Sequence, residues 1–367
     1  MTKKYPFYFR ATVILFGLIL FAYGLAVLRE VFVPLAFALL IAMLLNPLVA
    51  FLERHGFSKV PAIATVLLVS IIASIAITWL LYLQVNSFSD RLPAFSKKFG
   101  EFGSMLQSKA KNDLGISIQK QAQYIAEAKT SLKPLLAGFM GSAAGVLSML
   151  ILLPVYVFLL LFYKTLLITF FYELFTEERA AEVGAILSQT RSAVQNYMVG
   201  LLLEALIVAT LNSIALFILG VDYAILLGVV GALLNILPFI GGLIAILLPI
   251  IIATVTKDGF HTQLWIIMAY LVIQFIDNHF LVPYIVSSKV KINALVSIVI
   301  VLMGGALWGL SGMFLSIPFI GVLKIIFDRI PEMRPWGRLL GTEVPTQRGQ
   351  FARIRKRFRP SRGRPER

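Results

Sequence analysis

The sequence predicts an all-α, polytopic integral membrane protein with about eight membrane segments, two of them broken or re-entrant and arranged as an inverted repeat. The chain is 59% hydrophobic and only 14% charged, with a mean hydropathy of +0.88, whereas soluble domains carry about 25% charged residues. Apolar stretches near the ~20 residues that cross a bilayer recur along it. Two further stretches are too long for one span and contain Gly and Pro interruptions.

The expected membrane segments share a continuous apolar composition and cover 11–28, 31–52, 60–83, 142–163, 199–219, 222–255, 262–282 and 292–327. The first follows Lys3, Lys4 and Arg10, and Ala22-Tyr23-Gly24 resembles a signal-peptidase site. Because the apolar run continues past that site, we expect an uncleaved first span instead of a signal peptide. The domains expected are a cytoplasmic N-terminus (1–10), three spans (11–83), a fourth span (141–163) and a transport core (199–327).

Basic residues set the expected orientation, since cytoplasmic loops are enriched in Lys and Arg. Lys3, Lys4 and Arg10 precede the first span, and Arg54 and Lys59 follow the second. Both termini are then cytoplasmic. The 84–140 region lies outside the membrane and 164–198 inside.

Both of these regions are expected to be helical. In 84–140, apolar residues recur at spacings of three and four on both sides of a break at 112–115, which predicts an extracytoplasmic amphipathic helical hairpin. It either packs on the membrane domain or forms a subunit interface. In 164–198, Thr176 is suited to cap a cytoplasmic amphipathic helix whose first turn carries Glu177 and Glu178.

The C-terminal segment 328–367 is a strongly basic tail, expected to be disordered in the cytoplasm. The formal net charge of the chain is +15, and much of it comes from Arg353, Arg355, Lys356, Arg357, Arg359, Arg362, Arg364 and Arg367. We expect the tail to lie on anionic lipid, and nucleic acid is the less favoured partner.

The two long segments predict a cavity. At ~1.5 Å per residue, 222–255 and 292–327 would each be longer than the ~30 Å hydrocarbon core. The first is interrupted at 235–242, with Pro238, and the second between Gly304 and Gly312. Backbone groups freed at such breaks need protein or water as partners, because lipid offers none. The breaks are either the tips of re-entrant hairpins, which we favour, or kinks in full spans.

Each broken segment follows a span that carries a carboxylate, and paired interruptions of this kind point to a transporter site. Glu204 lies in 199–219, with Asn212 near the same helix face; Asp277 and Asn278 lie in 262–282. Ionisable groups within a span are costly, so a functional role is the first hypothesis. We therefore expect Asp277 and Glu204 to be candidates for the carboxylates that couple transport to a proton or cation. The alternative is that they are hydrated near a membrane interface or form hydrogen bonds that stabilise the fold.

Enzymatic and metal-dependent functions have little support. The chain has no Cys and three His residues without metal-ligand spacing, so no metal site or cofactor is expected. The run 309–312, Gly-Leu-Ser-Gly, matches the nucleophile motif of rhomboid intramembrane proteases, but His279 precedes the serine in the chain, whereas rhomboids have the reverse order. We expect no enzyme. A non-transporting membrane scaffold remains a lesser alternative.

Several motifs together resemble the autoinducer-2 exporter family of bacterial permeases over roughly residues 10–330. They are Leu44-Leu45-Asn46-Pro47-Leu48, Asn235-Ile236-Leu237-Pro238-Phe239-Ile240-Gly241, 274–283, Lys289-Val290-Lys291-Ile292-Asn293 and 304–318. The resemblance implies a homo-oligomeric permease of the bacterial cytoplasmic (inner) membrane with an elevator-like movement. Its implied substrate is autoinducer-2 or a related small polar solute; the alternative is exchange of sodium or lithium for protons. Glu204 departs from the family pattern.

The predicted solute or ion pathway lies between the two breaks. Its residues are amides, glycines and a carboxylate that suit a polar solute or a monovalent cation: Asn235, Pro238, Gly241, Gly242, Asp277, Asn278, Asn293, Gly304 and Gly305.

Overall fold

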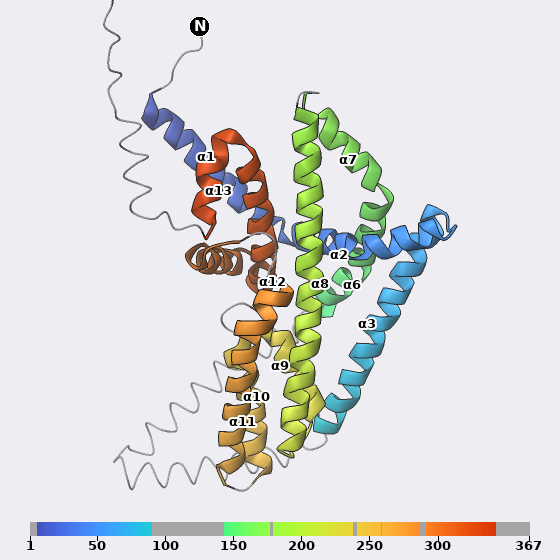
Figure 1. Cartoon of the computed structure of the whole chain (residues 1–367), viewed down its shortest axis with the longest axis vertical. Coiled ribbons are helices and arrows are strands. Elements are labelled where there is room, and N and C mark those ends of the chain that lie inside the picture. The colour runs from blue at the N-terminus through green and yellow to red at the C-terminus, as the bar shows by residue number, and fades with distance from the viewer. Residues whose placement is uncertain are drawn as a thin grey trace, which may run out of the picture.

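The computed structural model describes residues 6–89, 143–176, 179–237, 241–257, 259–286 and 291–342, and all regular elements in these ranges are helical (Figure 1). Six of these helices are long and apolar enough to cross a membrane. A seventh span results if α6 (Ala143–Phe162) and α7 (Lys164–Glu173), which meet at a 59° bend, are counted as one. The predicted all-α, polytopic membrane fold is confirmed.

Four N-terminal helices form the first part of the molecule: α1 (Phe7–Val27), α2 (Arg29–Arg54), α3 (Lys59–Ser89) and α6. α1 buries none of its residues, which suits a helix surrounded by lipid. On α2 the small and apolar residues of one face pack against α3 and α6; the buried cluster is Ala38, Ala42, Leu45, Val49, Ala62, Ile63, Val66, Val157 and Leu161.

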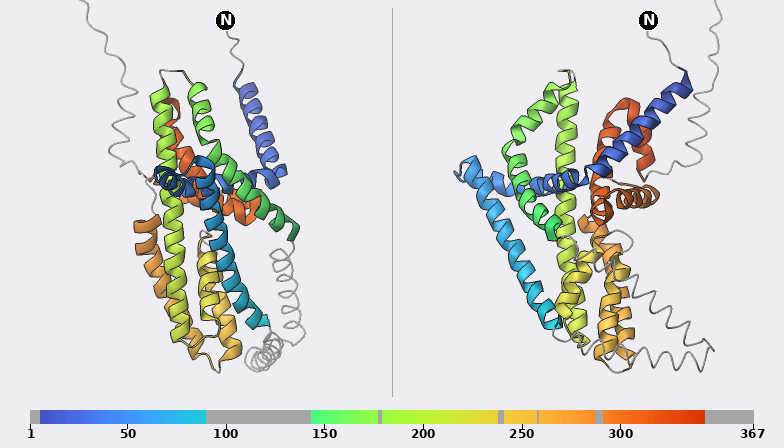
Figure 2. Two further views of the ribbon diagram at one scale, coloured as in Figure 1. Left: turned by 90° about the vertical axis from the view of Figure 1, so that its right-hand side faces the viewer. Right: turned by 180° about the vertical axis from the view of Figure 1, so that it is seen from behind.

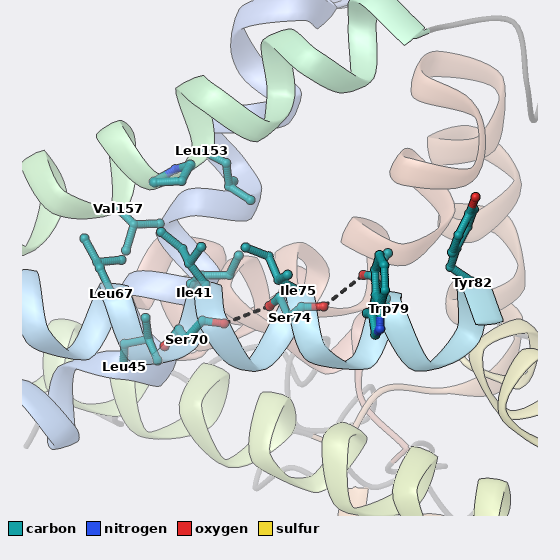
Figure 3. Close-up of a pocket in the computed structure, with 13 residues that line it drawn as sticks. Ile41, Leu45, Leu67, Ser70, Ser74, Ile75, Trp79, Tyr82, Leu153 and Val157 are labelled. Carbon is teal, nitrogen blue, oxygen red and sulfur yellow. Dashed lines mark hydrogen bonds between the residues drawn. The ribbon is translucent and has the colours of Figure 1, made fainter.

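The larger cavity of the described chain, of about 720 Å³, lies between α2, α3 and α6 and is apolar (Figure 3). Ser70, Ser74 and Thr78 line it, but each hydroxyl donates to the carbonyl four residues earlier on its own helix, at 2.8 to 2.9 Å. Back-bonding of this kind leaves little donor capacity for a solute. This cavity has the character of a lipid-facing groove.

The central element is α8 (Ala180–Ile218), a continuous helix of 39 residues (Figures 1 and 2). The sequence predicts a cytoplasmic helix in 164–198 and a separate span in 199–219. The structure instead joins the second half of the former to the latter without a break, because no Pro or Gly pair interrupts 185–215. At ~1.5 Å per residue, α8 extends well beyond the ~30 Å hydrocarbon core.

The first long segment is a helical hairpin. α9 (Ala224–Asn235) and α10 (Gly241–Thr256) pack against each other, with the Cβ of Ala245 3.5 Å from the Cβ position of Gly231. At the base, Val221 on one side and Ala253 on the other belong to the same buried cluster, together with Leu216 of α8.

The second long segment also reverses direction. α12 (Ala294–Arg329) has non-helical dihedrals at Trp308 and Gly309, where Gly309 has φ 62°. The hydroxyl of Ser316 donates to the carbonyl of Ile300 at 3.0 Å. In a straight helix these two residues would be about 24 Å apart. The contact therefore requires two antiparallel arms with a tip at 308–309.

The two hairpins open toward opposite ends of α8. The base of the first packs on Leu216, and the base of the second is tied to Gln189, which accepts from Arg329 at 3.1 Å. The tip of the second packs with Met198 through Trp308, and the tip of the first adjoins Leu201 and Glu204. Both tips therefore meet near the middle of α8, which is the arrangement an inverted repeat predicts.

Three predictions fall mostly or wholly outside the described residues. They concern the extracytoplasmic hairpin of 84–140, of which only 84–89 is described as the end of α3, and Pro238. They also concern the basic tail of 328–367, of which 328–342 is described; contrary to the expected disorder, this part is mostly helical and contains the end of α12 and the helix Arg334–Leu340.

Candidate functional site

Two carboxyl groups meet near the first hairpin's tip. Asp277 begins η2 (Asp277–Val286), a π-helix that continues α11 (His261–Ile276), and Glu204 lies midway along α8. Their side chains line the same cavity, and the residues are 2% and 6% exposed. π-helical turns are rare and occur frequently at functional sites. Here the change of helix type coincides with the buried carboxylate.

Two amide side chains face Asp277. Asn235, the last residue of α9, donates from Nδ2 to Asp277 Oδ2 at 2.9 Å, and Gln274 Nε2 lies 3.4 Å from the same oxygen. The other oxygen, Oδ1, is buried and has no hydrogen-bond donor among the described residues. A buried polar atom without a partner is unusual in native proteins and often indicates water, an ion or a functional role.

The carboxyl pair lies on a cavity of about 540 Å³, a size typical of small-molecule sites. Its walls come from α8, both arms of the first hairpin, α11 and η2. They are Leu201, Glu204, Asn235, Ile236, Leu237, Gly242, Leu243, Ile246, Tyr270, Leu271, Gln274, Asp277, Asn278 and Val282. The polar groups converge on one part of an otherwise apolar wall.

Gly242 keeps this polar part open. A Cβ atom there would lie 2.6 Å from Gln274 Oε1 and 3.3 Å from Asn235 Oδ1. The two amides thus present their nitrogens to Asp277 and their oxygens toward Gly242. Gly242 is also in the first turn of α10, where backbone N–H groups lack intrahelical partners.

A second polar layer lies deeper in the first hairpin. Asn212 of α8 and Tyr270 of α11 both approach Gly231, at 3.3 Å for Asn212 Nδ2 and 3.6 Å for the Tyr270 hydroxyl, measured from the Cβ position. Asn212 Oδ1 and the Tyr270 hydroxyl are buried without hydrogen-bond partners among the described residues. An apolar layer of Val208, Ala232 and Ile273 lies between them and the carboxyl pair. Tyr270 also lines the cavity.

The structure brings most of the predicted pathway residues together. Asn235, Gly242, Asp277 and Asn278 line one cavity with Glu204, and Gly241 begins α10 against the backbone of Leu234.

Three other predicted residues lie elsewhere. Asn293 caps α12 by accepting from the backbone N–H of Val296 at 2.8 Å, and it donates to the carbonyl of Leu339 at 2.7 Å. Gly304 packs against Gly312 within the second hairpin, and Gly305 faces Met313. Their part in a pathway stays a prediction.

Sequence reasoning did not single out Gln274 and Tyr270 as site residues. Both precede Asp277 on α11, three and seven residues earlier, and these spacings place all three side chains on one helix face. A search for polar residues at helical spacing from the buried carboxylate could have found them.

A metal site has no support in the described residues, which contain no group of three or more His, Asp or Glu side chains suited to hold an ion. His279 of the protease interpretation is exposed, and its Nδ1 lies 3.0 Å from the carbonyl of Phe275 on its own helix turn.

Several known proteins match most of this chain and are named as transport proteins. "AI-2 transport protein TqsA" of Escherichia coli K12 is 25% identical over 319 residues, covering 86% of this chain and 91% of the relative. "Putative transport protein YhhT" of the same strain is 27% identical over 335 residues, covering 90% and 94%. "Putative transport protein YrrI" of Bacillus subtilis is 24% identical over 323 residues, covering 84% and 89%. The family described as AI-2E family transporter matches residues 15–332. The chain therefore belongs to the AI-2E transporter family and is a multi-pass membrane transporter.

Proposed function

We propose that this transporter exports a small polar solute, autoinducer-2 or a related signal or metabolite, through the cavity between the first hairpin, α8 and α11. The observation that carries the proposal is the group of Asp277, Glu204, Asn235 and Gln274 on a cavity of about 540 Å³. Amide and carboxyl groups can both donate to and accept from the hydroxyls of a polar solute. The relative TqsA carries autoinducer-2 transport in its name.

The hairpins supply a route for alternating access. The first hairpin walls the cavity directly, and the second hairpin packs on the other half of α8. Movement of one hairpin would open the cavity to one side only, as transport by alternating access requires. An elevator-like displacement of this unit within a homo-oligomer belongs to the same proposal.

The carboxyl pair is proposed to bind a coupling proton. Two neighbouring buried carboxylates repel each other when both are ionised, and a proton on one of them removes this repulsion. Deprotonation of the pair would leave two buried charges, which favours opening of the cavity to water. Solute movement and proton movement would then be linked through Glu204 and Asp277.

The proposed setting is a bacterial cytoplasmic membrane with both termini in the cytoplasm. The basic residues before α1 and after α2 support this orientation. The arginine-rich tail would lie on anionic lipid of the same face.

A second candidate function is exchange of sodium or lithium for protons. The observation that favours it is a set of oxygen atoms on the cavity wall: Asp277 Oδ1 has no donor among the described residues, and Asn235 Oδ1 and Gln274 Oε1 lie near the Cβ position of Gly242. Carboxylate and amide oxygens are ligands that hard cations prefer.

Proteoliposomes containing the full chain distinguish the candidates. We expect autoinducer-2 or a related polar solute to accumulate under a proton gradient, and Asp277→Asn to reduce this accumulation at least tenfold. A pH change on adding sodium or lithium, without solute movement, would favour cation exchange. Normal coupled transport by Asp277→Asn would exclude the coupling role, and no movement of any solute or cation by the wild type would favour a scaffold. Asn196→Ala, an exposed change on α8, is the matched control.

A further inference from the structure

Positively charged side chains gather near the bend between α6 and α7, a corner of the molecule whose basic residues do not line the cavity. α3 begins at Lys59 and α7 begins at Lys164. The Lys59 ammonium lies 5.3 Å from the ring centre of Phe162, the last residue of α6. Since Phe162 precedes Lys164 by two residues, the two helix N-termini meet at the bend between α6 and α7. Arg191 of α8 is the largest charged influence on Lys164.

These cations occupy unfavourable positions for helix stability. A helix N-terminus carries partial positive charge and favours acidic side chains, yet a lysine is the first residue of both α3 and α7. No side chain caps the N-terminus of α7. The only ion pair within the described chain joins Lys324 and Asp328, so Lys59, Lys164 and Arg191 have no carboxylate partner there. Glu53 is the single acidic group that acts on Lys164.

A buried donor without a partner lies at the same corner. Lys164 Nζ donates to Asn46 Oδ1 at 3.0 Å, which places the Asn46 amide beside Lys164. Asn46 is 5% exposed, and its Nδ2 is buried without an acceptor among the described residues. A buried amide donor is costly to leave unpaired. The Asn46 amide therefore has a donor left for an acceptor from outside the described chain.

The pKa of Lys164 also indicates an excess of positive charge at this corner. The residue follows the end of α6 and lies in the segment expected to be cytoplasmic. Burial, and then the positive charges of Arg191 and Lys59, lower the pKa of its ammonium below the ordinary value. A bound anion would oppose the last two effects.

We propose that Asn46, Lys59, Lys164 and Arg191 form a binding site for a phosphate-bearing anion at the α6–α7 bend. Phosphate oxygens accept from ammonium, guanidinium, amide and helix N-terminal N–H groups alike. The corner joins the end of α6, which the sequence predicts to cross the membrane, to segments expected in the cytoplasm, so the phosphate can belong to an anionic phospholipid headgroup or to a soluble phosphate. Occupation would connect α2, α3 and the α6–α7 bend to α8.

Titration of delipidated, full-length protein tests the site. The melting temperature is measured against phosphatidylglycerol, zwitterionic phosphatidylcholine and inorganic phosphate, and bound lipid is counted by native mass spectrometry. We expect phosphatidylglycerol to stabilise at lower concentration than phosphatidylcholine. The double variant Lys59→Gln with Arg191→Gln should raise its half-saturating concentration at least tenfold, since each basic residue near an anionic lipid surface contributes roughly a fivefold effect.

Two further variants separate binding from folding. Glu53→Gln removes the one opposing acid and should lower the half-saturating concentration several-fold, which a purely structural role would not produce. Arg334→Gln with Arg338→Gln removes two exposed charges from α13 (Arg334–Leu340) and should leave it unchanged. The basic tail is present in every variant, so its own lipid binding cancels.

Separate titrations with inorganic phosphate and with phosphatidylglycerol identify the source of the phosphate. Inorganic phosphate that stabilises the wild type and fails to stabilise the double variant identifies a soluble ligand; phosphatidylglycerol acting alone identifies a lipid. The site does not exist if the Lys59 and Arg191 double variant binds both ligands like the wild type, or if the α13 control loses as much binding. This outcome is independent of transport, because none of these residues lines the cavity.

Discussion

Asn235 Nδ2 donates to Asp277 Oδ2 at 2.9 Å, and this bond joins the tip of the first hairpin to the start of the π-helix η2. The two residues are 42 positions apart in the chain. The hairpin tip is thus attached to the buried carboxylate that it covers. Any displacement of the hairpin from α11 would have to break or stretch this bond.

Replacing Asn235 with Ala should reduce coupled transport at least tenfold. The change removes a hydrogen bond to a charged group, which contributes about 1.5–3 kcal/mol, and leaves Asp277 with the long contact to Gln274. The measurement is initial rate in proteoliposomes at matched protein content. Asn196→Ala, on the exposed face of α8, should transport normally. A wild-type rate in Asn235→Ala would show that the bond has no part in the cycle.

Replacing Glu204 with Gln should uncouple transport from the proton gradient. The amide keeps the shape of the side chain and can still donate to Asp277, but the pair then has one ionisable group instead of two. We expect downhill solute movement to continue while accumulation driven by a pH gradient disappears. Glu182→Gln, in the first turn of α8, should leave accumulation intact, and coupled accumulation in Glu204→Gln would show that the proton binds elsewhere.

The interruptions of the two long segments could be predicted from the sequence because Gly and Pro have strong local effects on the backbone. Asn235 lies before the first break and Gly242 after it, and both residues line the cavity. The carboxylates were readable because a charge within an apolar run is rare. Glu204 was the less expected of the two, and the structure places it on the same cavity as Asp277.

Other features depended on contacts between distant segments, which no local pattern encodes. Asn293 follows Lys289 and Lys291 in the sequence and was predicted to be a further amide of the pathway, but it caps α12 and holds α13 through Leu339. Tyr270 and Asn212 both approach Gly231 only because α11, α8 and α9 pack together. The continuity of α8 past residue 199 was missed because a change from amphipathic to apolar composition does not end a helix.

Replacing Gly304 with Ala should destabilise the second hairpin. A Cβ there would lie 2.5 Å from the carbonyl oxygen of Gly312 on the opposite arm, and backbone cannot yield as a flexible side chain can. Overpacking of this kind typically costs about 1–3 kcal/mol. We expect a lower melting temperature in detergent and a lower yield of folded protein. Gly321→Ala, in the same α12 but with no atom within 4 Å of its Cβ position, should melt like the wild type; equal melting of Gly304→Ala would argue against the antiparallel arms.

Replacing Tyr270 with Phe should move stability and transport in opposite directions. The hydroxyl is buried without a partner among the described residues, so its removal relieves a desolvation cost of about 1–3 kcal/mol and should raise the melting temperature. The same hydroxyl lies beside Asn212 at the deeper end of a cavity that Tyr270 lines. If water or a solute hydroxyl binds there during the cycle, Tyr270→Phe should lower the transport rate several-fold while the folded protein becomes more stable. A purely structural tyrosine would lower both together or leave transport unchanged, and Tyr284→Phe, on an 83% exposed side chain of η2, should change neither.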